Sequence, residues 1–279
     1  MVVDWLERAA RQRGTILCLG LDPVPERIPI GGDDDIARTR EFLMTIIDRV
    51  GDRVAAVKPN SAFFEALGGR GIDLLVDVTR RAHACGLPVI LDAKRGDIGS
   101  TAEAYARYVF DVVGADMVTL SPYLGEDSLQ PFFRRMGDGR RGCYLLNRTS
   151  NPGGSLFQNK EVDGRPLYEH VAETIATWHG AHGSSIGAVV GATYPGELRI
   201  ITGIYARRQA MVPLLVPGVG SQGGDPAPVL EILRERGCLA RARVNSSSAI
   251  LYAHERREGP WLDAVVAQVE ETRSMLPCP

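Results

Sequence analysis

Three charged side chains stand where an apolar segment ends, and their types and spacing could do chemistry. Residues 86–91 are typical of a buried strand, and Asp92, Lys94 and Asp97 follow it. Because side chains alternate along a strand, Asp92 and Lys94 should share one face, and we expect all three to form a polar cluster. Buried charges are costly unless paired, so the cluster is either a structural ion pair or a working site. The three residues alone do not decide between the two.

The elements that must position this cluster alternate along the chain as repeated βα units do. Predicted strands cover residues 15–21, 54–58, 88–93, 116–120, 142–147, 186–191, 213–217 and 242–246. Predicted helices lie near residues 36–49, 71–85, 100–113, 126–135, 166–180, 196–208, 225–236 and 261–275. Eight of each predict an α/β fold, a (β/α)₈ TIM barrel in which residues 1–279 form a single domain. An open doubly wound sheet is the alternative.

Polar residues after the strands favour the closed barrel, because active sites of such barrels are built from the loops that follow the strands. These residues are Asp22, Lys58, Asp92, Lys94, Ser150, Thr193 and Gln222. A surface lysine is the alternative interpretation of Lys58. The longest loop candidates are residues 148–165 and 193–212, and loop 217–225 has the glycines that a closing lid needs.

Composition narrows the classes of partner. The chain of 279 residues is 44% hydrophobic, with a net charge of −2 and a pI near 6.2, which gives no general attraction to nucleic acid or to an anionic membrane. The N-terminal residues lack the apolar core of a signal peptide, and no apolar run approaches the length of a membrane span. We therefore expect a soluble, cytoplasmic protein that binds neither nucleic acid nor membrane.

Cysteines, histidines and glycines give little support for a metal or a dinucleotide. The five cysteines are scattered without a Cys-x-x-Cys pair, which indicates reduced thiols rather than disulfides or zinc. His179 and His182 are assigned to a helix end, because flanking glycines disfavour a rigid metal site. Residues 218–223 satisfy Gly-x-Gly-x-x-Gly, but they follow the seventh strand rather than the first. A single phosphate is the more usual ligand of that loop in a barrel.

The polar cluster belongs to a series of motifs that resembles one family. Asp-x-Lys-x-x-Asp at 92–97 is followed by Ile-Gly-Ser-Thr, and further similar segments lie at 20–23, 57–65, 121–125, 149–153, 191–195 and 217–225, in family order. The chain is similar to orotidine 5′-monophosphate decarboxylases, in the subgroup with somewhat longer chains. One such match would be weak, whereas seven in order are strong.

The resemblance implies a mechanism without metal or organic cofactor, the decarboxylation of orotidine 5′-monophosphate to uridine 5′-monophosphate in pyrimidine biosynthesis. Protonated Lys94 would stabilise the carbanion at C6 and then protonate it, with Asp92 and Asp97 keeping the lysine charged. Lys58 would hydrogen-bond the ribose and orient Asp92.

The remaining roles also follow from the resemblance. Substrate binding is assigned to Asp22 at the ribose, Ser150 at the pyrimidine amide, Gln222 between base and phosphate, and to Thr101, Gly223, Ser247 and Ser248. Asp97 and Thr101 would reach the partner's site in a homodimer.

One position departs from the family pattern. Ser248 stands where the family usually has an arginine that grips the phosphate, in the segment Asn245-Ser-Ser-Ser-Ala-Ile250. A neutral hydroxyl cannot replace a bidentate charged donor, since charge-assisted hydrogen bonds are roughly twice as strong as neutral ones. We therefore expect weakened phosphate binding, unless Arg241, Arg243 or Arg207 reaches the site.

Three alternatives to the pyrimidine enzyme stay open. The first is a paralogous decarboxylase that acts on a related nucleoside or nucleotide with altered 5′ phosphate recognition. The second is a magnesium-dependent sugar-phosphate decarboxylase or aldolase, which shares Asp-x-Lys-x-x-Asp but carries a metal-binding glutamate where this chain has Lys58. The third is a catalytically silent ligand-binding protein, against which the intact charged residues argue.

Overall fold

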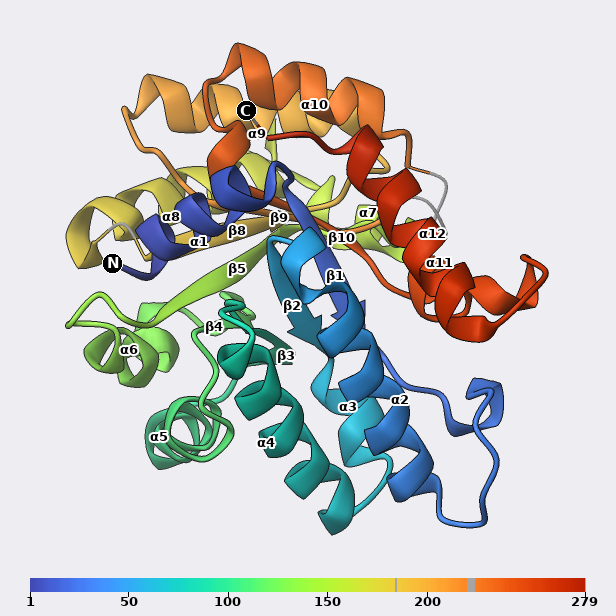
Figure 1. Cartoon of the computed structure of the whole chain (residues 1–279). Helices are drawn as coiled ribbons and strands as arrows, with labels where there is room; N and C mark the ends of the chain where they lie inside the picture. The colour runs from blue at the N-terminus through green and yellow to red at the C-terminus, as the bar shows by residue number, and fades with distance from the viewer. Residues whose placement is uncertain (184, 220–223, 279) are drawn as a thin grey trace.

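The computed structural model describes residues 1–183, 185–219 and 224–278, which form a barrel of parallel strands ringed by helices (Figure 1). Its eight-stranded sheet has the order β2-β1-β10-β9-β8-β5-β4-β3. Parallel bridges from Val57 to Val89 and from Asn60 to Asp92 join β2 to β3 and complete the barrel. The predicted (β/α)₈ TIM barrel is confirmed, and the open doubly wound sheet is wrong.

Every predicted strand and helix overlaps an element of the structure. The strands are β1 (Leu17–Leu21), β2 (Ala56–Pro59), β3 (Ile90–Arg95), β4 (Met117–Leu120), β5 (Gly142–Arg148), β8 (Ile186–Val190), β9 (Leu214–Val216) and β10 (Ala242–Ser246). The helices are α2 (Asp35–Val50), α4 (Gly69–Ala84), α5 (Gly99–Arg107), α6 (Glu126–Arg135), α8 (Leu167–His182), α9 (Pro195–Arg207), α10 (Pro226–Glu235) and α12 (Trp261–Met275). Helix α5 ends sooner than predicted, because the chain continues as the π-helical turn η3 (Tyr108–Val113).

Elements outside the βα repeat were not predicted. All of them except the 12-residue helix α1 are too short to show a hydrophobic period. They are α1 (Val2–Arg13), α3 (Ser61–Glu65), α7 (Ser155–Gln158), α11 (Ser248–Leu251) and the strands β6 (Glu161–Val162) and β7 (Arg165–Pro166). The 3₁₀ turns are η1 (Pro25–Arg27), η2 (Gly51–Arg53), η4 (Pro152–Gly154), η5 (Leu239–Arg241) and η6 (Ala253–Glu255). Several of them lie in the loops that build the site.

Helix α1 closes the barrel interior at the end where the strands begin. Val2, Val3 and Leu6 of α1 pack in one cluster with side chains from the strands, including Tyr144 of β5. Arg243 of β10 is fully buried, and its guanidinium donates hydrogen bonds to the carbonyl oxygens of Leu6, Ala240 and Ala242. The interior is therefore a packed core, and the open end is the one at which the strands finish.

A second, larger core lies between the strands and the ring of helices. In α2, the buried positions 42, 43, 46, 47 and 50 recur with helical spacing and form one apolar face. The carboxylate of Asp34 caps this helix by accepting hydrogen bonds from the backbone N–H groups of Ile36 and Ala37. The amphipathic pattern that predicted the helices thus buries one face of each against the barrel.

The two histidines near residue 180 have structural partners. His179 and His182 lie in the last turn of α8, as predicted. His179 Nδ1 is 2.8 Å from the carbonyl oxygen of Ile186, and His182 Nε2 is 2.7 Å from a carboxylate oxygen of Glu126.

In the described part of the chain, no helix combines the length and apolar character that crossing a bilayer requires.

The interior packing makes a prediction about Gly187 of β8. A Cβ at this position would lie 2.6 Å from Tyr144 Cδ1 and 2.7 Å from the carbonyl oxygen of Pro213. Because backbone and a buried ring must shift, we expect Gly187→Ala to lower the free energy of unfolding by about 1–3 kcal/mol in urea denaturation. Gly180→Ala on the exposed side of α8 is the control, because open space surrounds that position. Equal effects of the two substitutions would contradict this account of the packing.

Candidate active site

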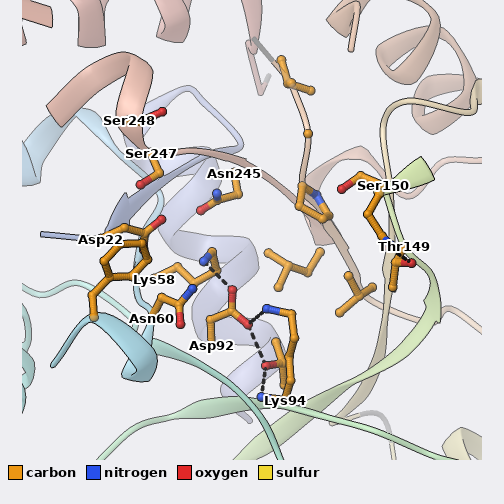
Figure 2. Close-up of a pocket in the computed structure, with 18 of the residues that line it drawn as sticks. Asp22, Lys58, Asn60, Asp92, Lys94, Thr149, Ser150, Asn245, Ser247 and Ser248 are labelled. Carbon is orange, nitrogen blue, oxygen red and sulfur yellow. Dashed lines mark hydrogen bonds and ion pairs between the residues drawn. The ribbon is translucent and has the colours of Figure 1, made fainter. Parts of the chain in front are cut away.

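A cavity of about 520 Å³ opens at the carboxyl ends of the strands. Its size falls in the range of small-molecule sites. Seven residues predicted from the sequence line it: Asp22, Lys58, Asp92, Lys94, Ser150, Ser247 and Ser248 (Figure 2). Side chains from loops far apart in the sequence therefore converge on one space, as the barrel prediction required.

The most strongly charged part of the cavity is an ion-paired cluster of Lys58, Asp92 and Lys94, which we call the charged triad. Lys58 Nζ donates to Asp92 Oδ2 at 2.7 Å, and Lys94 Nζ donates to Asp92 Oδ1 at 2.5 Å (Figure 2). Thr119 Oγ1 also donates to Asp92 Oδ1, at 2.9 Å. One carboxylate thus binds both ammonium groups, and the predicted cluster of Asp92 with Lys94 is confirmed.

An irregularity in β3 brings the two ends of the triad together. Between Leu91 and Arg95, β3 advances four residues while β4 advances two, from Val118 to Leu120. Lys94 has a φ of 46°, in the left-handed region that residues other than glycine seldom adopt, and its backbone N–H donates to Thr119 Oγ1 at 2.9 Å. The predicted contact between Asp92 and Lys94 is therefore correct. The regular strand alternation from which it was predicted is interrupted by this irregularity.

Burial separates the two lysines of the triad. The Lys58 side chain is 4% exposed and that of Asp92 11%, whereas the Lys94 side chain is 50% exposed. Lys58 therefore acts as a fixed internal counter-ion, and Lys94 presents its ammonium group to the cavity. The chain has only three lysines, at 58, 94 and 160, and two of them lie in this one site.

Opposite charges keep the buried members of the triad ionised. Burial by itself would raise the pKa of Asp92, but the charges of Lys58 and Lys94 outweigh it and hold this pKa well below its ordinary value. Burial would likewise lower the pKa of Lys58, but Asp92 and Asp22 outweigh it and raise this pKa above its ordinary value. At neutral pH the site therefore contains a carboxylate fixed between cations.

A second wall of the cavity presents polar atoms that have no partner. Asp22 Oδ1, Asn245 Oδ1 and Ser247 Oγ are all buried, and among the described residues none has a hydrogen-bond partner. Unpaired buried polar atoms are costly, so they commonly mark a place that a ligand or water fills. In Figure 2, these residues and Ser248 lie on the side of the cavity away from Lys94.

Two glycines let site serines lie against neighbouring strands. A Cβ on Gly20 of β1 would lie 2.5 Å from Ser247 Cβ, and one on Gly191, just after β8, would lie 2.9 Å from Ser150 Cα. Any larger side chain at either position would push a serine out of place. Both glycines belong to segments that the sequence analysis singled out, and their role becomes visible only in three dimensions.

The loop that carries Ser150 is held by a network of side chains. Gln158 Oε1 accepts hydrogen bonds from the backbone N–H of Thr149, at 3.0 Å, and from Arg148 Nη1, at 3.1 Å. Arg148 is buried and also forms an ion pair of 2.5 Å with Glu197. The predicted loop 148–165 therefore contains short ordered elements and tethers Ser150 at the cavity wall.

Two predicted site residues, Asp97 and Thr101, are not among the described residues that line this cavity. Asp97 accepts a hydrogen bond from the backbone N–H of Ile98 at 2.8 Å, and among the described residues no hydrogen bond or ion pair joins it to the triad. The expectation that Asp97 joins Asp92 and Lys94 in one cluster is therefore wrong for one subunit. Thr101 is exposed and lines a separate shallow pocket with Glu65 and Tyr105. Gln222 and Gly223 lie outside the described residues.

The arginines suggested as substitutes for a missing phosphate ligand do not line the cavity. Arg243 points to the opposite end of the barrel, where its burial lowers its pKa and carbonyl oxygens hold its guanidinium. Arg241 donates to the carbonyl oxygen of Met211 and lies 3.3 Å from Glu7, and Arg207 ends α9. The positions of these three arginines in the sequence therefore did not show which way their side chains point.

Sequence reasoning missed several residues that line the cavity. They are Arg27, Asn60, Thr119, Asn245 and Tyr252. Asn60, Thr119 and Asn245 lie at or next to strand ends, so the rule that located the other polar residues could have found them. Arg27 and Tyr252 lie in loops, and no spacing rule points to them.

Comparisons with known proteins agree with this geometry. A family model described as "Orotidine 5'-phosphate decarboxylase / HUMPS family" matches residues 15–258. An orotidine 5'-phosphate decarboxylase of Herpetosiphon aurantiacus is 46% identical over 255 residues, which cover 91% of this chain and 90% of the relative. One of Polaromonas naphthalenivorans is 43% identical over 279 residues, covering 98% of this chain and 94% of the relative.

Solved structures give the same result. The OMP decarboxylase of Leishmania donovani superposes with a TM-score of 0.77 at 34% identity, over 99% of this chain and 98% of that chain. The UMP synthase of the same organism superposes with a TM-score of 0.80 at 36% identity, over 98% of this chain. The chain spans only 56% of that longer protein. From the family match and these relatives, the chain belongs to the orotidine 5'-phosphate decarboxylase / HUMPS family.

Proposed function

We propose that this protein decarboxylates orotidine 5′-monophosphate to uridine 5′-monophosphate, with no metal or organic cofactor. The observation that carries the proposal is the charged triad, in which Lys94 extends an ammonium group into the cavity from a fixed carboxylate. The names of relatives at 43–49% identity support the same activity.

The reaction needs a positive charge beside C6 of the pyrimidine. The bond between C6 and its carboxylate breaks, carbon dioxide leaves, and the electron pair stays on C6. The Lys94 ammonium stabilises this pair and then transfers a proton to C6, after which the amine regains a proton from water. A group held in place before the reaction pays little reorganisation cost, and the bond to Asp92 holds Lys94 in this way.

Asp92 and Lys58 have supporting roles in this scheme. Asp92 lies beside the substrate carboxylate, and the repulsion between the two carboxylates is relieved when carbon dioxide departs. Lys58 keeps Asp92 ionised and hydrogen-bonds the ribose, and Asp22 accepts hydrogen bonds from the ribose hydroxyls. The unpartnered oxygen of Asp22 supports this assignment.

The remaining substrate contacts are proposed from the family motifs. Ser150 binds the pyrimidine amide, Gln222 bridges base and phosphate, and Gly223, Ser247 and Ser248 contact the phosphate end. The position of Ser150 across the cavity from Ser247 and Ser248 is consistent with a nucleotide that lies between them (Figure 2).

We also propose a homodimer in which Asp97 and Thr101 complete the partner's site. Within one subunit both residues lie off the cavity, so they are available to another chain. Ile98, next to Asp97 in the sequence, is 59% exposed, and Tyr123, in the loop after β4, is 89% exposed. Apolar groups at the surface beside a charged site are typical of subunit contacts. Such a dimer would be a cytoplasmic enzyme of pyrimidine biosynthesis, of the longer-chain subgroup.

Two alternatives make different predictions. A paralogue with altered 5′ phosphate recognition is favoured by one observation, the neutral Ser248 on the cavity, and it would gain no advantage from the phosphate in kcat/KM. A magnesium enzyme is disfavoured, because Lys58 already neutralises Asp92 at 2.7 Å and would repel a divalent ion. Activity lost on chelation and restored by magnesium would revive it.

Removing the Lys94 ammonium tests the chemistry directly. We expect Lys94→Ala to lower kcat by more than about 10⁴-fold, because charge stabilisation and proton transfer are lost together. Lys160→Ala at an exposed position is the matched control and should keep wild-type kcat. Near-normal turnover by Lys94→Ala, with an unchanged circular dichroism spectrum, would refute the mechanism.

Neutralising Asp92 tests the electrostatics of the triad. Asp92→Asn leaves Lys58 buried without its counter-ion, so we expect a loss of about 3–5 kcal/mol in the free energy of unfolding at pH 7. Because folding lowers the pKa of Asp92, its ionised form stabilises the folded wild type at pH values above 3.8, the ordinary pKa of the group. This stabilisation is lost progressively as the pH falls below 3.8 toward the lowered pKa. The difference between variant and wild type in urea unfolding should therefore shrink below about pH 4. Asp97→Asn is the control, and an equal loss there would contradict the account.

Mixing two inactive variants tests the shared site. If Asp97 acts in the partner's site, a dimer of one Lys94→Ala chain and one Asp97→Asn chain contains one intact site. After subunit exchange, an equal mixture should recover about a quarter of wild-type activity, because half the dimers are hybrids with one working site in two. No recovery, with hybrid dimers demonstrated by mass spectrometry, would place Asp97 in its own subunit's site. An Asp97→Asn protein that is active by itself would place Asp97 outside the chemistry.

A further inference from the structure

The proposed substrate carries a phosphate of nearly two negative charges, and the protein has a net charge of −2, so the balancing positive charge must be local. Among the described residues that line the cavity, the cations are Arg27, Lys58 and Lys94. The residues that the structure leaves undescribed contain no lysine or arginine in the sequence. In this arrangement of the loops, the cation for the phosphate comes from these three.

Two of the three cations are already engaged at the other end of the cavity. Lys58 and Lys94 both donate to Asp92, at 2.7 and 2.5 Å. Moving either one to the phosphate would leave the buried carboxylate of Asp92 short of a partner, which is costly. Arg27 is the remaining candidate.

Arg27 ends the turn η1, and its guanidinium is held on two sides. Nε and Nη2 donate to the two carboxylate oxygens of Glu255, at 2.8 and 2.6 Å. The guanidinium carbon lies 3.8 Å from the ring centroid of Tyr252. Among the described residues, Nη1 donates to no acceptor, so one edge of the fork stays available for a ligand.

The platform under Arg27 is rigid and connects the first and eighth βα loops. The Tyr252 hydroxyl accepts a hydrogen bond from the backbone N–H of Val24 at 2.6 Å and donates to the carbonyl oxygen of Asp22 at 3.1 Å. Its ring stacks on Phe42 of α2, with centroids 6.1 Å apart and an interplanar angle of 10°. Such anchoring lowers the entropy cost of holding an arginine in one place.

This platform continues the wall that carries the serines. Ser247, Ser248 and Tyr252 follow one another closely after β10, and all three line the same cavity as Arg27. Ser247 Oγ is buried and has no partner among the described residues, so it offers a second donor at this wall. The loop after β9 contributes Gly218 and Val219 to the cavity as well. The loops after the last two strands are where barrels commonly bind phosphate.

We propose that Arg27 binds the 5′ phosphate of the substrate through its free Nη1 edge, together with the hydroxyl groups of Ser247 and Ser248. This inference rests on the proposed function, because it takes the phosphate from that substrate. The cation comes from the first βα loop, and Glu255 positions it. Because Glu255 shares the charge of Arg27, the phosphate gains a charge-assisted hydrogen bond rather than a full isolated ion pair.

The test compares substrates with and without the phosphate. We expect Arg27→Ala to lower kcat/KM for orotidine 5′-monophosphate by roughly 10- to 100-fold, the equivalent of one or two charge-assisted hydrogen bonds. The value for orotidine, which lacks the phosphate, should stay within about twofold of wild type, since the triad is untouched. Arg70→Ala is the matched control, because Arg70 also pairs with a surface carboxylate, Asp34, but lies outside the cavity.

A second variant separates phosphate binding from a structural role. Adding Ser248→Arg to Arg27→Ala places a new cation on the same wall. For the phosphorylated substrate, kcat/KM of the double variant should be about tenfold higher than that of Arg27→Ala alone. Equal losses on both substrates, or no loss on the phosphorylated one, would overturn the inference and leave Arg27 as a structural clamp.

Binding of products without turnover keeps this test independent of the proposed function. Calorimetry should show that Arg27→Ala weakens the binding of uridine 5′-monophosphate by roughly 10- to 100-fold and leaves the affinity for uridine unchanged. Wild-type protein that binds the nucleotide through Arg27 but does not turn over orotidine 5′-monophosphate would refute the proposed function alone. Unchanged nucleotide binding in Arg27→Ala, with wild-type turnover intact, would refute the role of Arg27 alone.

Discussion

The carboxylate of Asp92 between two ammonium groups is the interaction on which the rest of the site depends. A single buried carboxylate next to a single lysine would leave little positive charge for a substrate. Here Lys58, almost fully buried, neutralises Asp92 from one side, and Lys94 binds it from the cavity side. The second lysine therefore has charge to offer to a developing carbanion while it remains fixed in position.

Local strain and tertiary packing together maintain this arrangement. Lys94 occupies a left-handed backbone conformation within an irregular segment of β3. Thr119 of the neighbouring strand stabilises it by accepting from the Lys94 backbone N–H and donating to Asp92. Strained residues persist where their surroundings over-determine them, and such places are commonly functional.

Charge is distributed toward two ends of one cavity. At one end lies the triad, to which we assign the proposed bond cleavage; at the other, Arg27 and the serines of the eighth loop form a wall with unused hydrogen-bonding capacity. Binding energy from a remote, non-reacting group can organise the reacting centre, so the two ends act on one reaction.

The sequence by itself determined the eight βα units and placed Asp22, Lys58, Asp92, Lys94 and Ser150 on one rim, because periodicity and strand ends are local properties of the chain. Only the tertiary structure decided which charged groups meet. It turned Arg243 to the bottom of the barrel, left Asp97 off the cavity and brought Arg27 onto it. Side-chain direction in loops and irregular strands depends on packing against residues distant in sequence, and no spacing rule records that packing.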